Sequence, residues 1–400
     1  MAKGKFQRVE KVSTGKKIGR AALIIILVIA LLLGAVVAFV FSKLGKITYD
    51  DGVVNETYSA QETEYENADD PTDVVEPTVD ATGEAADPAG ATEEVVFATE
   101  AEEEEGVNME GLEMVTAPNL STGELVSDKD VMNILLLGTD ERQAQFNTNS
   151  RSDVIILVSI NKKAGTVKLV SFSRGIAAPF MEGQYKGKYE WLTNLHRWGG
   201  ANMVMLALEE CFKVECDYFV RVNFQTVKTV VDAIGGIDMN LTKKEADYLN
   251  WFNNKVKNMA STTTQKPCVE GMNNLDGGMA CHYARLRAVD DDWVRMDRQR
   301  AVILAAVDKM KGSDLMTLNN LADLALPYVQ TNMSTLEIAK LIMYAPKFLD
   351  SDFDQLEIPI KNSYKGMTVM SGAGGWALDY NKNNAALHEF LYGTTDGGNG

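Results

Sequence analysis

Residues 131–138 read VMNILLLG, an apolar run that ends in glycine and predicts a buried strand. Two similar runs follow, VIILVSI at 154–160 and TVKLVSFS at 166–173, with the turn sequence NKKAG between them. Beyond them, helical and strand patterns alternate without strict strand–helix–strand regularity. We therefore expect an α/β fold, a single α/β sandwich in which helices flank a mixed central β-sheet.

The later elements are expected from periodicity and from capping or turn residues. The helices are expected at 199–212, 225–236, 243–262, 276–283, 296–311, 318–329 and 335–349. The remaining strands are expected at 218–224, 237–241, 356–360 and 367–370.

The N-terminal part of the chain indicates a membrane anchor. Residues 1–20 carry seven Lys/Arg and one Glu, and 21 apolar residues follow from Ala21 to Phe41. Such a run can span a hydrocarbon core, and the basic flank places its N-terminal side in the cytoplasm. We expect a cytoplasmic tail at 1–20 and one transmembrane helix at 21–42. The alternative is a cleaved signal peptide, whose apolar region is usually shorter, about 7–15 residues.

The next segment separates the anchor from the rest. Residues 47–127 contain 23 Asp/Glu and no Lys or Arg, which predicts a disordered extracytoplasmic linker. A ligand for basic cell-wall partners is the alternative interpretation of this acidic segment. These carboxylates account for the negative net charge of the chain, −17. The predicted domain at 128–393 is therefore close to neutral, which argues against nucleic-acid binding. Residues 394–400 are expected to be a flexible tail.

Four cysteines occur, at positions 211, 216, 268 and 281. Cys211 and Cys281 lie in apolar stretches and are expected to be buried as small hydrophobic residues. A Cys268–Cys281 disulfide is possible outside the cytoplasm, and the sequence leaves the disulfide state open.

Two carboxylates stand at predicted strand ends, Asp140 in LLLGTDER and Asp153 in NSRSDVIIL. Ligands usually bind at such an edge of a sheet, and Mg²⁺ (or Mn²⁺) takes few protein carboxylates together with water and substrate phosphate. These residues are therefore candidate metal ligands. The alternative is that both are turn residues paired with the neighbouring Arg142 and Arg151.

Residues 285–300 read RLRAVDDDWVRMDRQR, which holds five arginines. Guanidinium groups bind phosphate oxygens in pairs and keep their charge, so this density indicates a pyrophosphate site. A helix N-terminus at this point adds to such an anion site. A surface helix with ion pairs to Asp291, Asp292 and Asp297 is the alternative, and it accounts best for Arg300. The candidate ligand-binding residues are Arg174, Arg285, Arg287, Arg295, Arg298 and Gln299.

Together these motifs resemble the LytR–CpsA–Psr family, membrane-anchored enzymes that attach glycopolymers to peptidoglycan in Gram-positive bacteria. The resemblance runs from about residue 133 to 391 and rests on NILLLGTDER, RSDVIILVSI, VSFSR, YFVRVNF…VVDAIGGIDM and LDGGMACHYARLR…DDDWVRMDRQR. It implies that Asp140 and Asp153 bind Mg²⁺ and that Arg174, Arg285, Arg287, Arg295 and Gln299 hold the pyrophosphate of a polyprenyl-linked donor, with Asp292 supporting the arginines. Arg174 and Asp292 are thereby the candidate catalytic residues. The lipid is expected in an apolar tunnel between sheet and helices.

The chain departs from the family pattern in two places. Gly175 follows Arg174 where the family commonly has Asp, and YEWLTNLHRWGG replaces a segment rich in Lys, Ile, Asn and Ala. The expected function is a phosphotransferase that moves a polyprenyl-pyrophosphate-linked glycan onto a cell-wall acceptor at the outer face of the membrane. The alternatives are a polyprenyl-pyrophosphate hydrolase and a non-catalytic protein that binds lipid-linked glycan or regulates the envelope.

Overall fold

The computed structural model describes residues 45–50, 109, 111–141, 146, 149–256, 265–286, 292–311, 320–321, 323–344 and 353–393. The chain divides into two compact units, Met1–Lys46 and Ile47–Gly400, and the elements below belong to the second. The predicted tail at 1–20, the transmembrane helix at 21–42 and the tail at 394–400 lie outside the described residues. Within the described ranges, no helix is long and apolar enough to cross a membrane.

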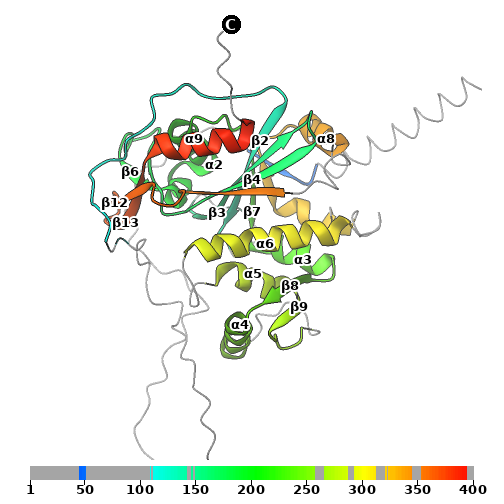
Figure 1. Cartoon of the computed structure of the whole chain (residues 1–400). Coiled ribbons are helices and arrows are strands. Elements are labelled where there is room, and N and C mark those ends of the chain that lie inside the picture. Colours follow the sequence, from blue (N-terminus) through cyan, green and yellow to red (C-terminus); the bar gives the residue numbers. More distant parts are fainter. Residues whose placement is uncertain are drawn as a thin grey trace, which may run out of the picture. The chain divides into compact units, whose positions relative to one another are not determined.

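A mixed sheet of seven strands forms the centre of the second unit, as expected (Figure 1). Its middle is an antiparallel meander, to which β7 adds parallel to β2 and β11 adds parallel to β4. The strand order is β1 (Thr48–Tyr49), β10 (Val329–Thr331), β7 (Tyr218–Asn223), β2 (Val131–Thr139), β3 (Ser152–Asn161), β4 (Thr166–Phe172), β11 (Phe353–Ile358).

Helices cover both faces of this sheet (Figure 1). Leu135 and Leu137 of β2 pack into an apolar cluster with α2 (Leu192–Phe212) and α9 (Tyr380–Tyr392). Ile134 belongs to a cluster on the other face, with α6 (Asp292–Lys311) and α8 (Thr335–Tyr344). Because successive side chains point to opposite faces, a strand buried on both faces must be continuously apolar, which explains the VMNILLLG run.

A smaller layer lies on the far side of α6 (Figure 1). Its own apolar cluster includes Val231, Leu249 and Leu275, and Val302 of α6 also packs into it. The layer consists of α3 (Phe224–Ala233), β8 (Ile237–Leu241), α4 (Lys243–Val256), β9 (Gly271–Leu275) and α5 (Gly277–Arg285). Helix α6 is therefore buried on two sides, between the sheet and this layer.

Two hairpins lie beside the end of β4. The first pairs β5 (Ala177–Pro179) with β6 (Tyr189–Trp191), and the second pairs β12 (Tyr364–Thr368) with β13 (Gly374–Leu378). An isolated bridge between Ile176 and Trp376 joins the two hairpins.

The structure differs from the predicted elements in several places. Helix α2 begins at Leu192 instead of residue 199, and its backbone is non-helical at Gly199 and Gly200. The C-terminal part of the helix expected at 318–329 is a single 3-10 turn, η1 (Leu326–Tyr328), which leads into β10. The sequence prediction missed the strands β1, β5, β6, β9, β10 and β13 and the helix α9.

Residues 47–127 were assigned to the disordered linker, yet Thr48–Tyr49 forms strand β1 of the sheet and residues 111–127 lie along the domain. Val115 N donates to Gly366 O at 2.9 Å, and Val126 N donates to Lys213 O at 2.8 Å. Leu112 and Leu120 pack against the main apolar cluster. Apolar side chains at the end of an acidic segment thus attach it to the domain, so the domain begins before the predicted residue 128.

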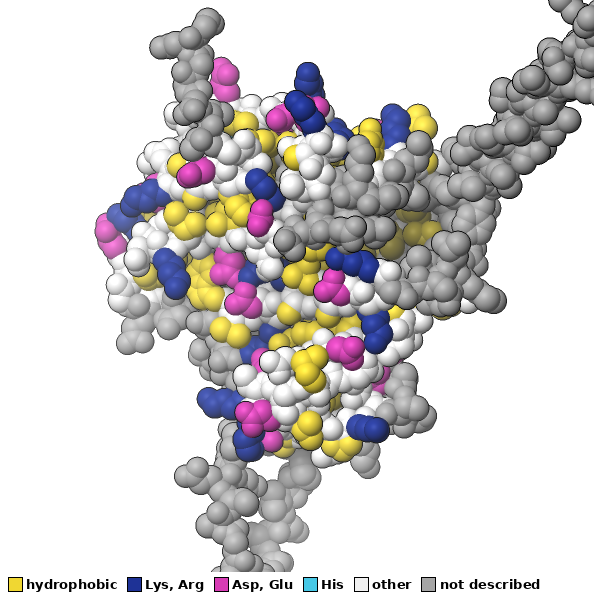
Figure 2. Space-filling view, turned by 45° about the vertical axis from the view of Figure 1, so that its right-hand side comes forward, with side chains coloured by type: hydrophobic (Ala, Val, Ile, Leu, Met, Phe, Trp, Pro, Cys, Tyr) yellow, Lys and Arg dark blue, Asp and Glu magenta, His cyan; other side chains and the backbone are white. Residues whose placement is uncertain are grey.

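The four cysteines are buried and free. On the face that Figure 2 presents, acidic and basic side chains are interspersed among apolar patches.

Candidate functional site

The two predicted carboxylates lie side by side at one edge of the sheet. Thr139, the last residue of β2, pairs with Ser152, the first residue of β3, so Asp140 and Asp153 come from adjacent strands. A bulge between Gly138 and Thr139 interrupts the register there. Gly138 is needed at this point because a Cβ atom would lie 2.8 Å from Val154 Cβ on the neighbouring strand.

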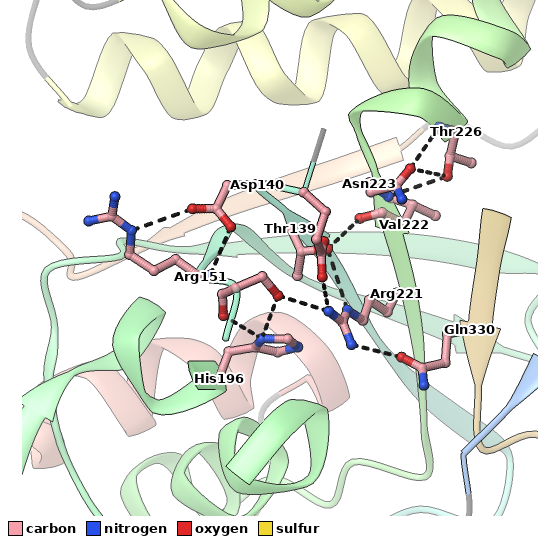
Figure 3. Close-up of polar contacts among 11 residues, drawn as sticks. Thr139, Asp140, Arg151, His196, Arg221, Val222, Asn223, Thr226 and Gln330 are labelled. Atoms are coloured by element: carbon pink, nitrogen blue, oxygen red, sulfur yellow. Dashed lines mark hydrogen bonds and ion pairs between the residues drawn. The ribbon is translucent and has the colours of Figure 1, made fainter. Parts of the chain in front are cut away.

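The Asp140 carboxylate is held in place by the facing strand (Figure 3). Its Oδ1 atom accepts the backbone N–H of Arg151 at 2.9 Å, and its Oδ2 atom lies 3.5 Å from Arg151 Nε. Burial and then the negative charge of Asp153 raise the pKa of Asp140 above its ordinary value, although Arg151 opposes the shift. Two neighbouring carboxylates with this mutual repulsion are a donor set that suits a hard divalent cation.

Among the described residues, Asp140 and Asp153 are the two carboxylates that meet in this way. Across the described ranges, the side chains form no cluster of three or more His, Cys, Asp or Glu that could hold a metal ion. A cation here would therefore keep most of its coordination positions for water and for phosphate oxygens, which is the usual arrangement of Mg²⁺ with a phosphorylated substrate.

Arg174 joins the carboxylates at the same edge, two residues after the end of β4. Its Nη1 atom lies 3.5 Å from Asp153 Oδ1, and its guanidinium carbon lies 5.7 Å from the centre of the Trp191 ring. Trp191 is itself fixed, because its Nε1 atom donates to Gly374 O at 2.8 Å. The guanidinium of Arg174 thus has defined neighbours on two sides.

Trp376 connects the start of α6 to the segment that carries Arg174. Trp293, in the first turn of α6, stacks on Trp376 with ring centres 5.5 Å apart and planes at 11°. Trp376 N donates to the carbonyl oxygen of Gly175, the residue after Arg174, at 2.9 Å. The first turn of α6, with the partial positive charge of a helix N-terminus, is thus linked through Trp376 to the residue that follows Arg174.

Helix α5 brings Arg285 toward this edge. The helix begins at the predicted cap, where Asp276 accepts from Met279 N at 2.9 Å. Arg285, in its last turn, lies with its guanidinium carbon 4.7 Å from the centre of the Phe224 ring. Phe224 directly follows β7, whose last residue pairs with Thr139 at the end of β2. Arg285 therefore approaches the sheet edge that carries Asp140.

The remaining candidates lie in or before α6. Arg295 and Gln299 are buried in its first turns. Arg287 lies outside the described residues, as does the side chain of Asp292, whose backbone begins α6. The expected ion pair of Arg300 with Asp297 is present, and Glu357 of β11 also binds this guanidinium.

Arg298 corrects the sequence prediction. Its guanidinium is buried, donates from Nε to Glu245 Oε1 at 2.7 Å and donates from Nη1 to Leu286 O at 3.1 Å. Burial alone would raise the pKa of Glu245, but hydrogen bonds from Thr242 and Arg298 lower it below its ordinary value. Arg298 therefore ties α6 to α4 in an internal ion pair, and it is removed from the ligand-binding set.

The sequence analysis missed a buried polar cluster beside Asp140 (Figure 3). Arg221 of β7 is 4% exposed and contacts Glu141, Ser150 and Gln330, and His196 of α2 is fully buried against Ser150. The strand alternation contained the signal, because Arg221 has the same parity as the buried Phe219. An arginine on the inward face of a strand requires buried partners.

Comparison with known proteins agrees with this fold. Residues 91–386 match the model of the LytR_cpsA_psr family, and the chain belongs to that family. The polyisoprenyl-teichoic acid–peptidoglycan teichoic acid transferase TagU of Bacillus cereus (strain AH820) is 29% identical over 219 residues, 54% of this chain and 64% of the relative. TagT of Bacillus subtilis (strain 168), which has the same transferase name, is 29% identical over 210 residues, 52% and 61% of the two chains. The chain thus spans less than two thirds of the length of these relatives.

A solved structure of TagT bound to LI-WTA superposes with a TM-score of 0.51 at 23% identity, covering 69% of this chain and 97% of the other. This similarity supports the mixed α/β fold.

Proposed function

We propose that this protein is a membrane-anchored phosphotransferase, a glycopolymer ligase that moves a polyprenyl-pyrophosphate-linked glycan onto peptidoglycan or another cell-wall acceptor. The observation that carries the proposal is the meeting of Asp140, Asp153 and Arg174 at one sheet edge. Family membership and the transferase names of the relatives support it, and those names favour teichoic acid as the glycan.

The charges of the site suit a pyrophosphate with a divalent cation. Asp140 and Asp153 would hold Mg²⁺ (or Mn²⁺), which would neutralise phosphate oxygens when bound. Arg174 and Arg285 approach the same edge from two different elements, and their guanidinium groups match the remaining phosphate oxygens. Arg287 and Arg295 are expected to add to this set, and Asp292 is expected to support the arginines.

The transfer breaks one phosphorus–oxygen bond and forms another. The acceptor hydroxyl oxygen attacks the phosphorus that carries the glycan, in line with the oxygen that bridges the two phosphates. The bond from that phosphorus to the bridging oxygen breaks, polyprenyl phosphate leaves, and the acceptor proton is lost to water. Arg174 and the other positively charged groups are already in position before the reaction starts. They offset the negative charge that develops on the leaving phosphate.

The departure at Gly175 leaves these groups in place. The carbonyl oxygen of Gly175 accepts from Trp376 N, and Arg174 keeps Asp153 and Trp191 as neighbours. The positive charge that faces the ligand comes from arginines, so the absence of a carboxylate at position 175 reduces repulsion of an anion. Gly175→Asp is accordingly expected not to improve ligand binding.

The test supplies the full-length protein in detergent with Mg²⁺, a polyprenyl-pyrophosphate-linked teichoic acid precursor and peptidoglycan oligomers. Mass spectrometry should find polyprenyl phosphate and a phosphodiester that joins glycan to peptidoglycan. Arg285→Ala and Asp140→Asn should lower the yield at least tenfold, whereas the matched control Arg300→Lys should retain it. Release of polyprenyl phosphate at the same rate without peptidoglycan would instead indicate a hydrolase, and binding without turnover would indicate a non-catalytic protein.

The proposal places residues 1–20 in the cytoplasm, the anchor at 21–42 in the membrane and the domain outside. It is supported by the seven Lys/Arg that precede the apolar run. Protease added to intact protoplasts should remove the domain. A domain that survives in intact protoplasts but is digested after lysis would contradict this topology.

A further inference from the structure

The buried cluster around Arg221 lies next to the backbone that carries Asp140 (Figure 3). Arg221 stands near the end of β7, which runs parallel to β2 and reaches the same edge of the sheet. Its guanidinium is almost wholly enclosed, with 4% of the residue exposed, and Gln330 and the Phe146 ring line two of its sides. Its donors go to the protein groups Thr139, Glu141, Ser150 and Gln330, so this guanidinium holds the protein together and does not face a ligand directly.

The contacts of Arg221 surround the backbone that carries Asp140. Its Nη2 atom is paired with Glu141, the residue after Asp140. Its Nε atom lies 3.4 Å from the Oγ1 atom of Thr139, the residue before Asp140, and this hydroxyl donates to Val222 O at 3.2 Å. One guanidinium thus holds both chain neighbours of a proposed metal ligand.

The same guanidinium also holds the facing strand. Arg221 Nη2 donates to Ser150 Oγ at 2.8 Å, and Ser150 directly precedes Arg151, whose backbone N–H donates to the Asp140 carboxylate. The carbonyl oxygen of Ser150 accepts from His196 Nδ1 at 2.8 Å. Arg221 and His196 therefore determine together where this backbone donor stands.

We propose that Arg221 is a positioning residue of the Asp140–Asp153 site, holding residues 139–141 and Ser150 so that the Asp140 carboxylate is placed for a divalent cation. This inference rests on the proposed function, because it takes Asp140 and Asp153 as the cation ligands. Only a planar group with several donors can bind Glu141, Ser150 and Thr139 together, and a lysine ammonium has neither the reach nor the fork geometry. Residues that orient metal ligands usually change metal affinity by about 10- to 100-fold when they are altered.

The experiment measures Mn²⁺ binding to the full-length protein in detergent by electron paramagnetic resonance of free Mn²⁺. The acidic segment at 47–127 carries 23 Asp/Glu and is expected to bind Mn²⁺ as well, so specific binding is taken as the difference from the Asp140→Asn, Asp153→Asn double variant. Arg221→Lys should weaken specific Mn²⁺ binding about tenfold or more.

Arg300→Lys is the matched control. Arg300 is also a buried arginine with carboxylate and amide partners, Asp297, Glu357 and Gln355, but these join α6 to β11. The Arg300→Lys protein should be less stable than the wild type, but its Mn²⁺ affinity should change by no more than about twofold. Arg221→Lys should lose more Mn²⁺ affinity than that.

The outcomes separate the inference from the proposed function. Folded Arg221→Lys protein that binds Mn²⁺ within twofold of the wild type overturns the positioning role and leaves the metal site intact. Wild-type protein that binds no more Mn²⁺ than the double variant refutes the metal site and the inference with it. If circular dichroism shows that Arg221→Lys does not fold, Ser150→Ala decides, because it removes one contact and keeps the Arg221–Glu141 pair. Unchanged affinity in Ser150→Ala would overturn the inference, and a loss of about threefold would support it.

Discussion

Replacing His196 should remove part of the acid sensitivity of the fold. His196 is fully buried, and its Nδ1 atom lies 2.8 Å from the Ser150 carbonyl oxygen, which can only accept, so Nδ1 carries a proton. Burial foremost, and then the positive charge of Arg221, lower the pKa of His196 from 6.5 to about 4.

The sign of the effect follows from proton uptake. As pH falls below about 6.5, the imidazole of the unfolded chain takes up a proton, whereas the folded protein takes it up only near pH 4. The unfolded state is therefore favoured as pH falls through this window. Below both pKa values, the His196 titration lowers the free energy of unfolding by about 3 kcal/mol in total. About 1.4 kcal/mol of this loss occurs between pH 7.5 and pH 5.5.

Urea unfolding of the wild type and of His196→Asn at these two pH values tests this. Asparagine keeps a donor for the Ser150 carbonyl oxygen and does not titrate. Carboxylates titrate in both proteins, so the free energy of unfolding of the wild type should fall by about 1.4 kcal/mol more than that of the variant. Between pH 7.5 and 8.5 the two should change in parallel, which is the internal control. Equal losses at pH 5.5 would refute a buried, neutral His196.

Asp140→Asn combined with Asp153→Asn should abolish any rise in melting temperature produced by Mg²⁺ or Mn²⁺, because both hard oxygen donors are removed; a retained rise would place the metal elsewhere. Arg298→Met should lower the free energy of unfolding by about 3–5 kcal/mol, since it leaves Glu245 buried without its partner, and adding Glu245→Gln should recover part of the loss. Equal urea unfolding of the single and double variants would contradict this ion pair. Gly277→Ala should lower the free energy of unfolding by about 2 kcal/mol or more, because its Cβ atom would lie 2.2 Å from a backbone carbonyl oxygen of α3. A melting temperature within a degree of the wild type would show that α3 and α5 separate easily.

Local signals in the sequence were sufficient for much of this protein. Continuous apolar runs predicted β2, β3 and β4, because strands covered on both faces have no polar alternation. The placement of Asp140 and Asp153 followed from their positions at the ends of two successive strands, which pair through a short connection. Asp276 predicted the start of α5, because a cap bonds to an N–H three residues away.

What the sequence could not determine involves partners far apart along the chain. Helical periodicity placed Arg295, Arg298 and Gln299 near one face of α6, but it did not show that Glu245, 53 residues earlier, would take the Arg298 guanidinium. The strand that holds Arg221 was predicted, whereas its contacts with Glu141 and Ser150 depend on β7 adding beside β2. The periodicity of a helix or strand in the sequence determines only on which face of that helix or strand a side chain lies. The group that it meets depends on how the elements pack, and therefore only the tertiary structure separates the arginines that approach the candidate ligand site from those that hold the fold together.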